Sequence, residues 1–225
     1  MSDVYEVAEV TLSGVPPGLM MQSGRSIDPL DPLTKLMSPI RKMREKTDFI
    51  HQQLADLEFI CALYTTQPGG VQIEESGEVT IDGFGNVCLP GDALEASIIQ
   101  GAKSFKKGTA AKTSFLFEPY YELLIDGAPL SVKEAWRRRS EFSDRRPVGI
   151  RDNRVMKTRP LFREWTVKMR FSYLANVFNK KTVADIIERA GAVAAVGTYR
   201  PRFGRFTADD VTLVEANGRA RKRAA

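Results

Sequence analysis

The sequence predicts an α+β protein whose core elements follow the order β-α-β-β-α-β. Residues 161–173 alternate apolar and polar side chains, as a half-buried strand does. Two segments, 90–103 and 179–195, space their apolar residues as amphipathic helices do. The remaining strands of the predicted core come before, between and after these helices, at residues 4–13, 113–124 and 205–215.

The first strand is followed by a long insertion. Val4, Ala8, Val10 and Leu12 share one parity, which predicts a strand over residues 4–13. We interpret residues 14–90 as an insertion that opens with a proline- and glycine-rich loop. Helical spacing then runs from Leu33 to about Lys46, with a break expected at Pro39, while residues 59–64 fit either a strand or a helix end. Short hairpin pieces are predicted at residues 71–73, 79–81 and 87–89.

The middle of the chain supplies a helix and a strand. Pro90-Gly91-Asp92 provides a turn and a cap, and the helix that follows has one apolar face, formed by Leu94, Ile98, Ile99 and Ala102. Residues 113–124 are rich in aromatic side chains and predict a strand, in which Pro119 indicates an edge or a bulge.

The clearest strand pattern, at residues 161–173, assigns its side chains to two faces. The apolar face carries Leu161, Trp165, Val167, Met169, Phe171 and Tyr173. The opposite face, predicted to meet solvent, carries Phe162, Glu164, Thr166, Lys168, Arg170 and Ser172. Asn179 then caps a helix with the apolar stripe Val183, Ile186, Ile187 and Ala190, and the last strand is expected to be irregular at Asp209-Asp210.

This order of elements is that of the ferredoxin-like, split βαβ arrangement. Four antiparallel strands would carry both helices on one face and leave the other face of the sheet free. We expect one domain over residues 1–217, with the insertion at 14–90 and a basic arm at 131–160 between the second and third strands. Residues 218–225 are expected to form a disordered basic tail.

Charge divides the chain into an acidic and a basic part. Residues 1–100 hold six Lys/Arg and fifteen Asp/Glu, whereas residues 101–225 hold twenty-seven and thirteen. Between Trp136 and Arg170 there are twelve Lys/Arg against four acids, with aromatic residues among them. Such a region suits a polyphosphate, because cations neutralise the backbone while rings stack on bases. The alternative is a solvated, salt-bridged surface, which is what charge runs usually form.

The most specific local motif is GTYRPRFGRF at residues 197–206. It lies between a predicted helix and a predicted strand and contains two glycines, three arginines and three rings. Glycines allow close approach of the backbone to a phosphate, and guanidinium groups match phosphate oxygens in a fork geometry. The alternative is a turn whose rings plug the core and whose arginines face water.

The predicted nucleic-acid interface combines this loop, the basic arm and the free sheet face. Trp136 and Tyr199 are its aromatic members, although Trp136 could equally anchor the arm to the domain. The cationic members are Arg137, Arg138, Arg139, Arg145, Arg146, Arg151, Arg154, Lys157, Arg159, Lys168, Arg170, Arg200, Arg202 and Arg205.

A helix, a glycine- and arginine-rich loop, and Gly204-Arg205-Phe206 opening a final strand resemble the C-terminal signature of the RAMP superfamily, the RRM-fold proteins of CRISPR effector complexes. The string is also similar to the tails of some phage-encoded proteins. The resemblance covers residues 162–214 and, loosely, 4–13, but not 14–90, and the spacing from Gly197 to Gly204 is not a dense GxGxxG. It implies an RRM-like fold with a thumb-like arm, single-strand binding and side-by-side assembly.

We therefore expect a cytoplasmic, non-enzymatic protein that binds single-stranded RNA or DNA, as a homo-oligomer or as a subunit of a ribonucleoprotein. Two alternatives remain open. One is a phage virion or assembly protein whose acidic and basic faces pair between subunits. The other is a RAMP-type ribonuclease that uses His51, the sole histidine.

Cofactors, metal ions and membranes are not expected as partners. His51, Cys61 and Cys88 lack paired ligand spacing, so the sequence predicts no metal site. The two cysteines are too few for a disulfide framework and are expected to be reduced, buried apolar residues. No apolar run approaches the roughly 20 residues that span a bilayer, and the first residues lack the pattern of a secretory signal.

Overall fold

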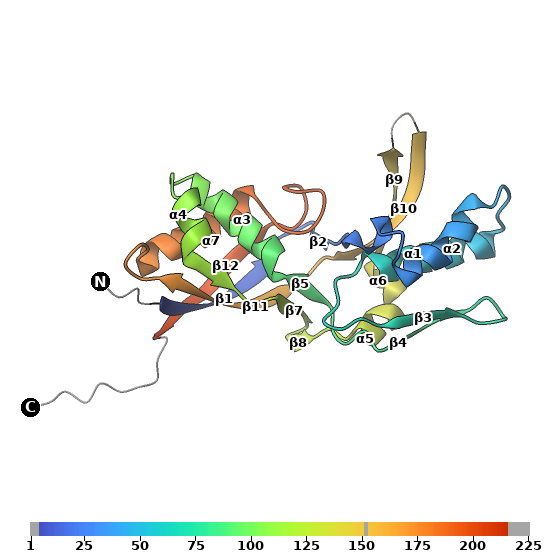
Figure 1. The fold of residues 1–225 in the computed structure, drawn as a ribbon, viewed down its shortest axis with the longest axis horizontal. Coiled ribbons are helices and arrows are strands. Elements are labelled where there is room, and N and C mark those ends of the chain that lie inside the picture. The colour runs from blue at the N-terminus through green and yellow to red at the C-terminus, as the bar shows by residue number, and fades with distance from the viewer. Residues whose placement is uncertain (1–4, 151–152, 216–225) are drawn as a thin grey trace, which may run out of the picture.

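The computed structural model describes residues 5–150 and 153–215 and shows an elongated α+β molecule with two lobes (Figure 1). The first lobe holds the main antiparallel sheet and helices α3 (Gly91–Lys103), α4 (Gly108–Ser114) and α7 (Lys180–Val193). The second lobe holds most of the insertion and the basic arm. One cluster of buried apolar side chains extends through both lobes, from Met37 and Leu57 to Val183 and Ile187. The two lobes therefore share a core.

The main sheet has the strand order β12-β1-β11-β7-β5, with β6 beside β11 and β8 beside β7. Every pair of neighbours is antiparallel. In β1, Ala8, Val10 and Leu12 are buried, as their shared parity predicts; Val4 lies outside the described residues. The strands are β1 (Tyr5–Gly14), β5 (Cys88–Pro90), β6 (Phe115–Phe117), β7 (Tyr120–Ile125), β8 (Ala128–Pro129), β11 (Thr166–Leu174) and β12 (Phe206–Glu215).

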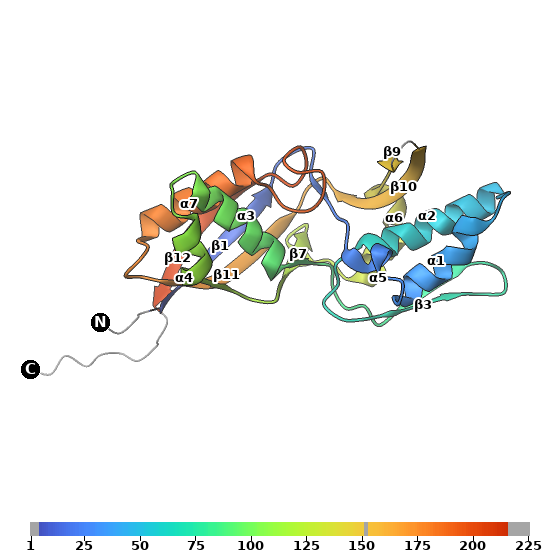
Figure 2. The ribbon, with the colours of Figure 1, turned by 45° about the horizontal axis from the view of Figure 1, so that its top comes forward.

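Helices α3 and α7 pack against each other on one face of this sheet (Figure 2). The predicted cap is confirmed, because the Asn179 side chain accepts a hydrogen bond of 2.9 Å from the Thr182 amide. The predicted stripe of α7 is fully buried: Val183, Ile186, Ile187 and Ala190. At the crossing with α3 the helices approach so closely that a Cβ on Gly101 would lie 2.6 Å from the Ile186 carbonyl oxygen.

The predicted strand at residues 161–173 is wrong as a single element. It is divided into β10 (Asn153–Phe162) and β11, with a bend at residues 163–165. The prediction that Phe162 faces solvent is also wrong, since Phe162 is fully buried and packs on Phe142 at a ring-centroid distance of 5.1 Å. The reason is that β10 belongs to a different sheet, in which it pairs with β2 and β9, so the alternation of the two faces of β11 does not continue across the bend.

Residues 113–124 also contain more than the one strand predicted. Residues 113 and 114 end helix α4, which the sequence analysis missed, and the chain then forms β6 and β7 with an interruption at Pro119 as expected. The Tyr121 hydroxyl donates to the Arg170 carbonyl at 2.6 Å and accepts from the Glu118 amide at 2.8 Å. Burial raises the pKa of Tyr121 to about 12, so this link from the interruption to β11 persists at neutral pH.

The irregularity expected at Asp209-Asp210 is confirmed. The register between β12 and β1 shifts between Glu9, which pairs with Thr212, and Thr11, which pairs with Asp209. Such a bulge inserts extra residues in one strand and increases its twist.

The insertion contributes β2 (Leu19–Met20), the 3₁₀ helix η1 (Gly24–Ile27), α1 (Pro32–Lys42), α2 (Asp48–Ala62), β3 (Gly70–Ile73) and β4 (Val79–Asp82). The β3–β4 hairpin is confirmed, but the third expected piece, β5, pairs with β7 in the main sheet. Pro39 lies inside α1 rather than breaking it. Of the two alternatives left open for residues 59–64, the helix end is confirmed for residues 59–62, which close α2. The earlier part of α2 was missed, because Leu57, Phe59, Ile60 and Cys61 are all buried and form no single stripe.

Both cysteines are free and buried, as expected. Burial raises the pKa of Cys61 and of Cys88 to about 11, so both thiols are neutral at pH 7. Within the described ranges, no helix combines the length and apolar character needed to cross a membrane.

The crossing of α3 and α7 gives a test of this packing. We expect Gly101→Ala to lower the free energy of unfolding by about 2 kcal/mol, because the added methyl overpacks the crossing. Alanine is the better helix former by about 1 kcal/mol, so propensity alone predicts the opposite sign. Gln100→Ala, at the exposed neighbouring position, serves as the control and should change stability by less than about 0.5 kcal/mol. Urea denaturation followed by circular dichroism measures both, and a stabilised Gly101→Ala protein would contradict the packing.

Candidate nucleic-acid interface

The basic arm predicted at residues 131–160 folds as two short helices and a β-hairpin. The helices are α5 (Val132–Arg137) and α6 (Arg139–Phe142), and the hairpin is formed by β9 (Ser143–Ile150) and β10. It projects from the second lobe (Figure 1). In its register Arg146 lies opposite Lys157 and Arg145 lies opposite Thr158. Because side chains alternate along a strand, these two pairs lie on opposite faces of the hairpin.

The loop at residues 197–205 packs against the base of this hairpin. The Arg159 guanidinium lies 5.0 Å from the centroid of the Tyr199 ring and donates a hydrogen bond of 3.2 Å to its hydroxyl. The Arg146 guanidinium lies 5.0 Å from the Phe203 ring and 5.9 Å from the Tyr199 ring. Cation–π contacts therefore join two segments that the sequence analysis assigned separately to the interface.

The two loop glycines close the loop and do not form a phosphate cradle. Both have left-handed φ angles, +79° at Gly197 and +77° at Gly204. A Cβ on Gly204 would lie 1.7 Å from the Val196 carbonyl oxygen, and one on Gly197 would lie 2.4 Å from the Met20 carbonyl oxygen. The Gly204 amide donates to Gly18. The glycines are thus explained by contacts with the chain's own backbone.

Tyr199 also has a left-handed backbone, with a φ of +57°. For a bulky residue this conformation costs about 1–3 kcal/mol and persists only where surrounding contacts hold it. Here the two guanidinium groups and the Phe203 ring provide those contacts, and the Tyr199 side chain still remains 40% exposed. These contacts therefore hold a partly exposed aromatic ring between two cations, in a backbone conformation that is unfavourable by itself.

The three loop arginines are exposed and have no carboxylate partner within the described part of the chain. Arg205 donates through Nε to the Pro201 carbonyl at 3.0 Å. Arg200 lines an open cavity of about 630 Å³ together with Gln100, Val193 and Tyr199. Arg202 is exposed. The loop thus presents three exposed cations that form no ion pair with an acid of the described residues.

Six of the predicted interface cations instead form ion pairs with acids of the same chain. Arg137 pairs with Glu134 and Arg138 with Glu141, both at 2.8 Å, and these hydrogen bonds lower the pKa of each carboxyl group. The others are Arg139 with Asp56 at 3.2 Å, Arg146 with Asp144, Lys157 with Glu58 at 2.7 Å, and Arg170 with Glu9 at 3.3 Å. A phosphate would have to compete with these acids.

The open face of the sheet carries Lys168 and Arg170, as predicted, and both are exposed. However, Phe171 and Tyr173 of β11 point into the core. Along the described side chains of the two central strands, the open face has one ring, that of Tyr5 at the start of β1. The middle of this face therefore offers no platform on which bases could stack.

The remaining predicted residues lie in different parts of the molecule. Trp136 is half-buried against the core beneath the Arg139 guanidinium, at 4.3 Å, so it anchors the arm. Arg145 and Arg154 are exposed on the hairpin, and neither has a carboxylate partner in the described ranges. Arg151 lies outside the described residues. His51 is exposed on α2, two helical turns and about 10 Å along the axis from Glu58.

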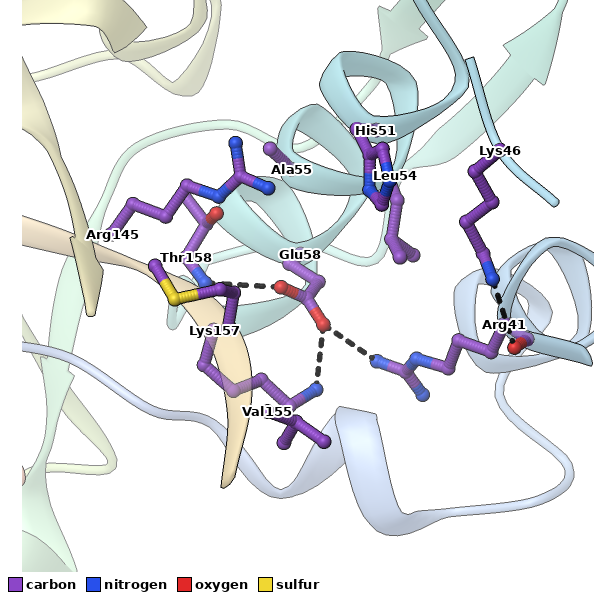
Figure 3. Close-up of a pocket in the computed structure, with 11 residues that line it drawn as sticks. Arg41, Lys46, His51, Leu54, Ala55, Glu58, Arg145, Val155, Lys157 and Thr158 are labelled. Carbon is purple, nitrogen blue, oxygen red and sulfur yellow. Dashed lines mark hydrogen bonds and ion pairs between the residues drawn. The ribbon is translucent and has the colours of Figure 1, made fainter. Parts of the chain in front are cut away.

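A cavity of about 500 Å³ between α2 and the hairpin was not anticipated (Figure 3). At its wall, buried Glu58 accepts hydrogen bonds from the Arg41 guanidinium at 3.3 Å, the Lys157 ammonium at 2.7 Å and the Thr158 amide at 3.0 Å. Glu58 and Lys157 are 99 positions apart in the sequence. Nothing in the local pattern around Glu58, within a helix that was itself missed, indicates this pairing.

No cluster of three or more His, Cys, Asp or Glu residues that could hold a metal ion occurs in the described ranges. No protein-family model matches this chain, and no curated protein matches it.

The Glu58 cluster gives a second test. We expect Glu58→Gln to lower the free energy of unfolding by about 2–3 kcal/mol, because two cations lose their buried partner. This lies below the cost for a fully buried pair, since Arg41 and Lys157 retain 31% and 22% exposure. The matched control is Glu9→Gln, which removes the exposed pair with Arg170 and should cost less than about 1 kcal/mol. Equal effects in denaturant titrations would show that the Glu58 cluster does not hold α2 to the hairpin.

Proposed function

We propose that this chain binds single-stranded nucleic acid through the loop at residues 197–205 and the adjoining hairpin. The observation that carries the proposal is that Arg200, Arg202 and Arg205 are exposed, form no ion pair within the described residues and belong to the same loop as the partly exposed Tyr199. Unpaired guanidinium groups bind phosphates, and a ring held between cations can stack on a base that is not paired in a duplex. Figures 1 and 2 both place the loop beside the hairpin.

In this mechanism the predicted cations have three different roles. Arg200, Arg202 and Arg205 of the loop contact the phosphate backbone. Arg146 and Arg159 fix the orientation of Tyr199. Cations that are paired with acids stabilise the arm and the insertion instead. Binding is non-enzymatic, and whether the strand is RNA or DNA depends on contacts to the 2′-hydroxyl.

We also propose a relation to the RRM-like proteins of the RAMP superfamily. The four strands that alternate with α3 and α7 lie in the order β12-β1-β11-β6. Strand β7 also pairs with β11, at residues 166–167. Both helices lie on one face. This order and layering support a ferredoxin-like core. The long insertion and the absence of central rings on the open face are departures that move the proposed binding surface from the sheet to the loop.

Removing the loop charges tests the proposed interface. We expect the triple substitution Arg200→Gln, Arg202→Gln and Arg205→Gln to reduce affinity for a single-stranded oligonucleotide by about tenfold or more. The slope of log K against log salt should become shallower by about 2, because each lost phosphate contact contributes about 0.7. Fluorescence anisotropy over a series of salt concentrations measures both quantities.

A matched control replaces Lys112, Lys180 and Lys181 with Gln, which removes the same charge from exposed positions on α4 and α7. The control should retain the wild-type slope. Equal losses in the two triple variants would mean that net charge alone governs binding, and tighter binding of duplex than of single strands would contradict the role of Tyr199.

A structural role in an assembly is a second candidate, favoured by one observation. The β3–β4 hairpin at the end of the second lobe exposes Glu74, Glu75, Glu78 and Asp82. None of them has a cationic partner in the described residues. We propose that this acidic hairpin of one copy contacts the basic loop of the next copy, so that copies line up along a strand.

Charge reversal tests this contact. We expect Glu74→Lys with Glu78→Lys to abolish the rise in mass that the wild type shows when a long oligonucleotide is added, as measured by light scattering, while a short oligonucleotide still binds. The control, Glu164→Lys with Glu188→Lys, changes exposed acids outside the β3–β4 hairpin and should assemble normally. A wild type that remains a single copy on long strands would rule out the assembly.

A further inference from the structure

Two cavities adjoin between α2 and the inner face of the hairpin. The cavity of about 500 Å³ in Figure 3 and a second of about 390 Å³ share three lining residues: Ala55, Arg145 and Thr158. Thr158 and Arg145 therefore stand at the boundary between the two. They are also direct partners in the register of β9 and β10, which places their side chains next to each other on the same face of the hairpin.

The larger cavity has a strong excess of positive charge. Arg41, Lys46, Arg145 and Lys157 line it, and Glu58 is its only acid, so the four cations and one carboxylate leave a balance of 4 − 1 = +3, with His51 in addition. Glu58 is saturated by Arg41, Lys157 and the Thr158 amide. Lys46 donates to the carbonyls of Met43 and Arg41. Arg145 has no such partner within the described chain.

Thr158 provides an independent sign of a ligand. The residue is 4% exposed, and its hydroxyl oxygen is buried without a hydrogen-bond partner among the described residues. A buried hydroxyl left unsatisfied is destabilising, so such groups usually have a partner. In Figure 3 the side chains of Arg145 and Thr158 lie side by side, whereas Lys46 and His51 lie on the other side of Glu58. The hydroxyl and the guanidinium thus lie next to each other, and neither donates a hydrogen bond to an acceptor of the described residues.

We propose that Arg145 and the Thr158 hydroxyl form a seat for the phosphate of a nucleoside monophosphate. The phosphate accepts from both groups, and the remaining cations of the cavity attract its charge. Leu54, Val155 and Met156 give the cavity an apolar wall that suits the base. The choice of a nucleotide as ligand rests on the proposed function, and the nucleotide is either the phosphorylated end of the bound strand or a free molecule.

The test compares ligands that differ only in the phosphate. We expect an oligonucleotide with a terminal phosphate, at the 5′ or the 3′ end, to bind the wild type about tenfold or more tightly than the same strand with hydroxyl ends. Thr158→Val and Arg145→Gln should each remove this preference. Valine has the shape of threonine without the unsatisfied hydroxyl, so Thr158→Val should fold at least as stably as the wild type. Arg154→Gln, which changes a cation of the same hairpin that lines neither cavity, should retain the preference.

Separate arms of the experiment identify the source of the phosphate. Adenosine monophosphate and inorganic phosphate are titrated into the wild type and into Thr158→Val by calorimetry. Binding of the mononucleotide that Thr158→Val abolishes supports the seat, even if no strand binds and the proposed function fails. Conversely, if the loop variant loses strand binding while phosphorylated and unphosphorylated strands bind the wild type equally and the mononucleotide does not bind, the seat is refuted and the proposed function stands.

Discussion

The buried carboxylate of Glu58 is the interaction on which the arrangement of the proposed interface depends. It joins helix α2 of the insertion to strand β10 through the Lys157 side chain and the Thr158 amide. This contact orients the hairpin, and the hairpin in turn places Arg146 and Arg159 against Tyr199. The contacts that hold the Tyr199 ring therefore depend on a carboxylate in a distant part of the chain. An acid that is 7% exposed is favourable here because two cations and a backbone amide satisfy it.

Alternation along β9 gives the hairpin two different faces. Arg146 faces the rings of Tyr199 and Phe203, whereas its neighbour Arg145 lines the cavities beside α2. Consecutive arginines thus serve the loop surface and the proposed phosphate seat separately. A strand that followed the loop could reach both sites only by passing around the hairpin, so its end, rather than its middle, is the part suited to the seat.

Charge density in the sequence overstates the charge that is available for a ligand. Arg137 and Arg138 occur in the densest basic run of the chain, yet each is held by a glutamate three positions away. Lys157 and Arg139 are held by acids of α2, in the acidic half of the chain. Part of the separation between acidic and basic halves therefore serves to join the insertion to the arm. Among the predicted interface cations of the described residues, those without an acid partner lie in the loop, on the hairpin and, at Lys168, on the open face of the sheet.

Local pattern was sufficient for elements whose burial repeats with a regular period. The apolar stripe of α7, its Asn179 cap and the parity of β1 follow from spacing alone, because one face of each element meets the core. Pattern failed at α2, which is buried on several sides, and at Phe162, where the chain changes sheets. The predicted site was similarly divided. The exposure of the loop arginines could be predicted from the composition of the loop. The pairing of Glu58 with Lys157 and the register that places Arg145 opposite Thr158 could not, because the tertiary structure decides both contacts. Neither contact has a signal in the local sequence.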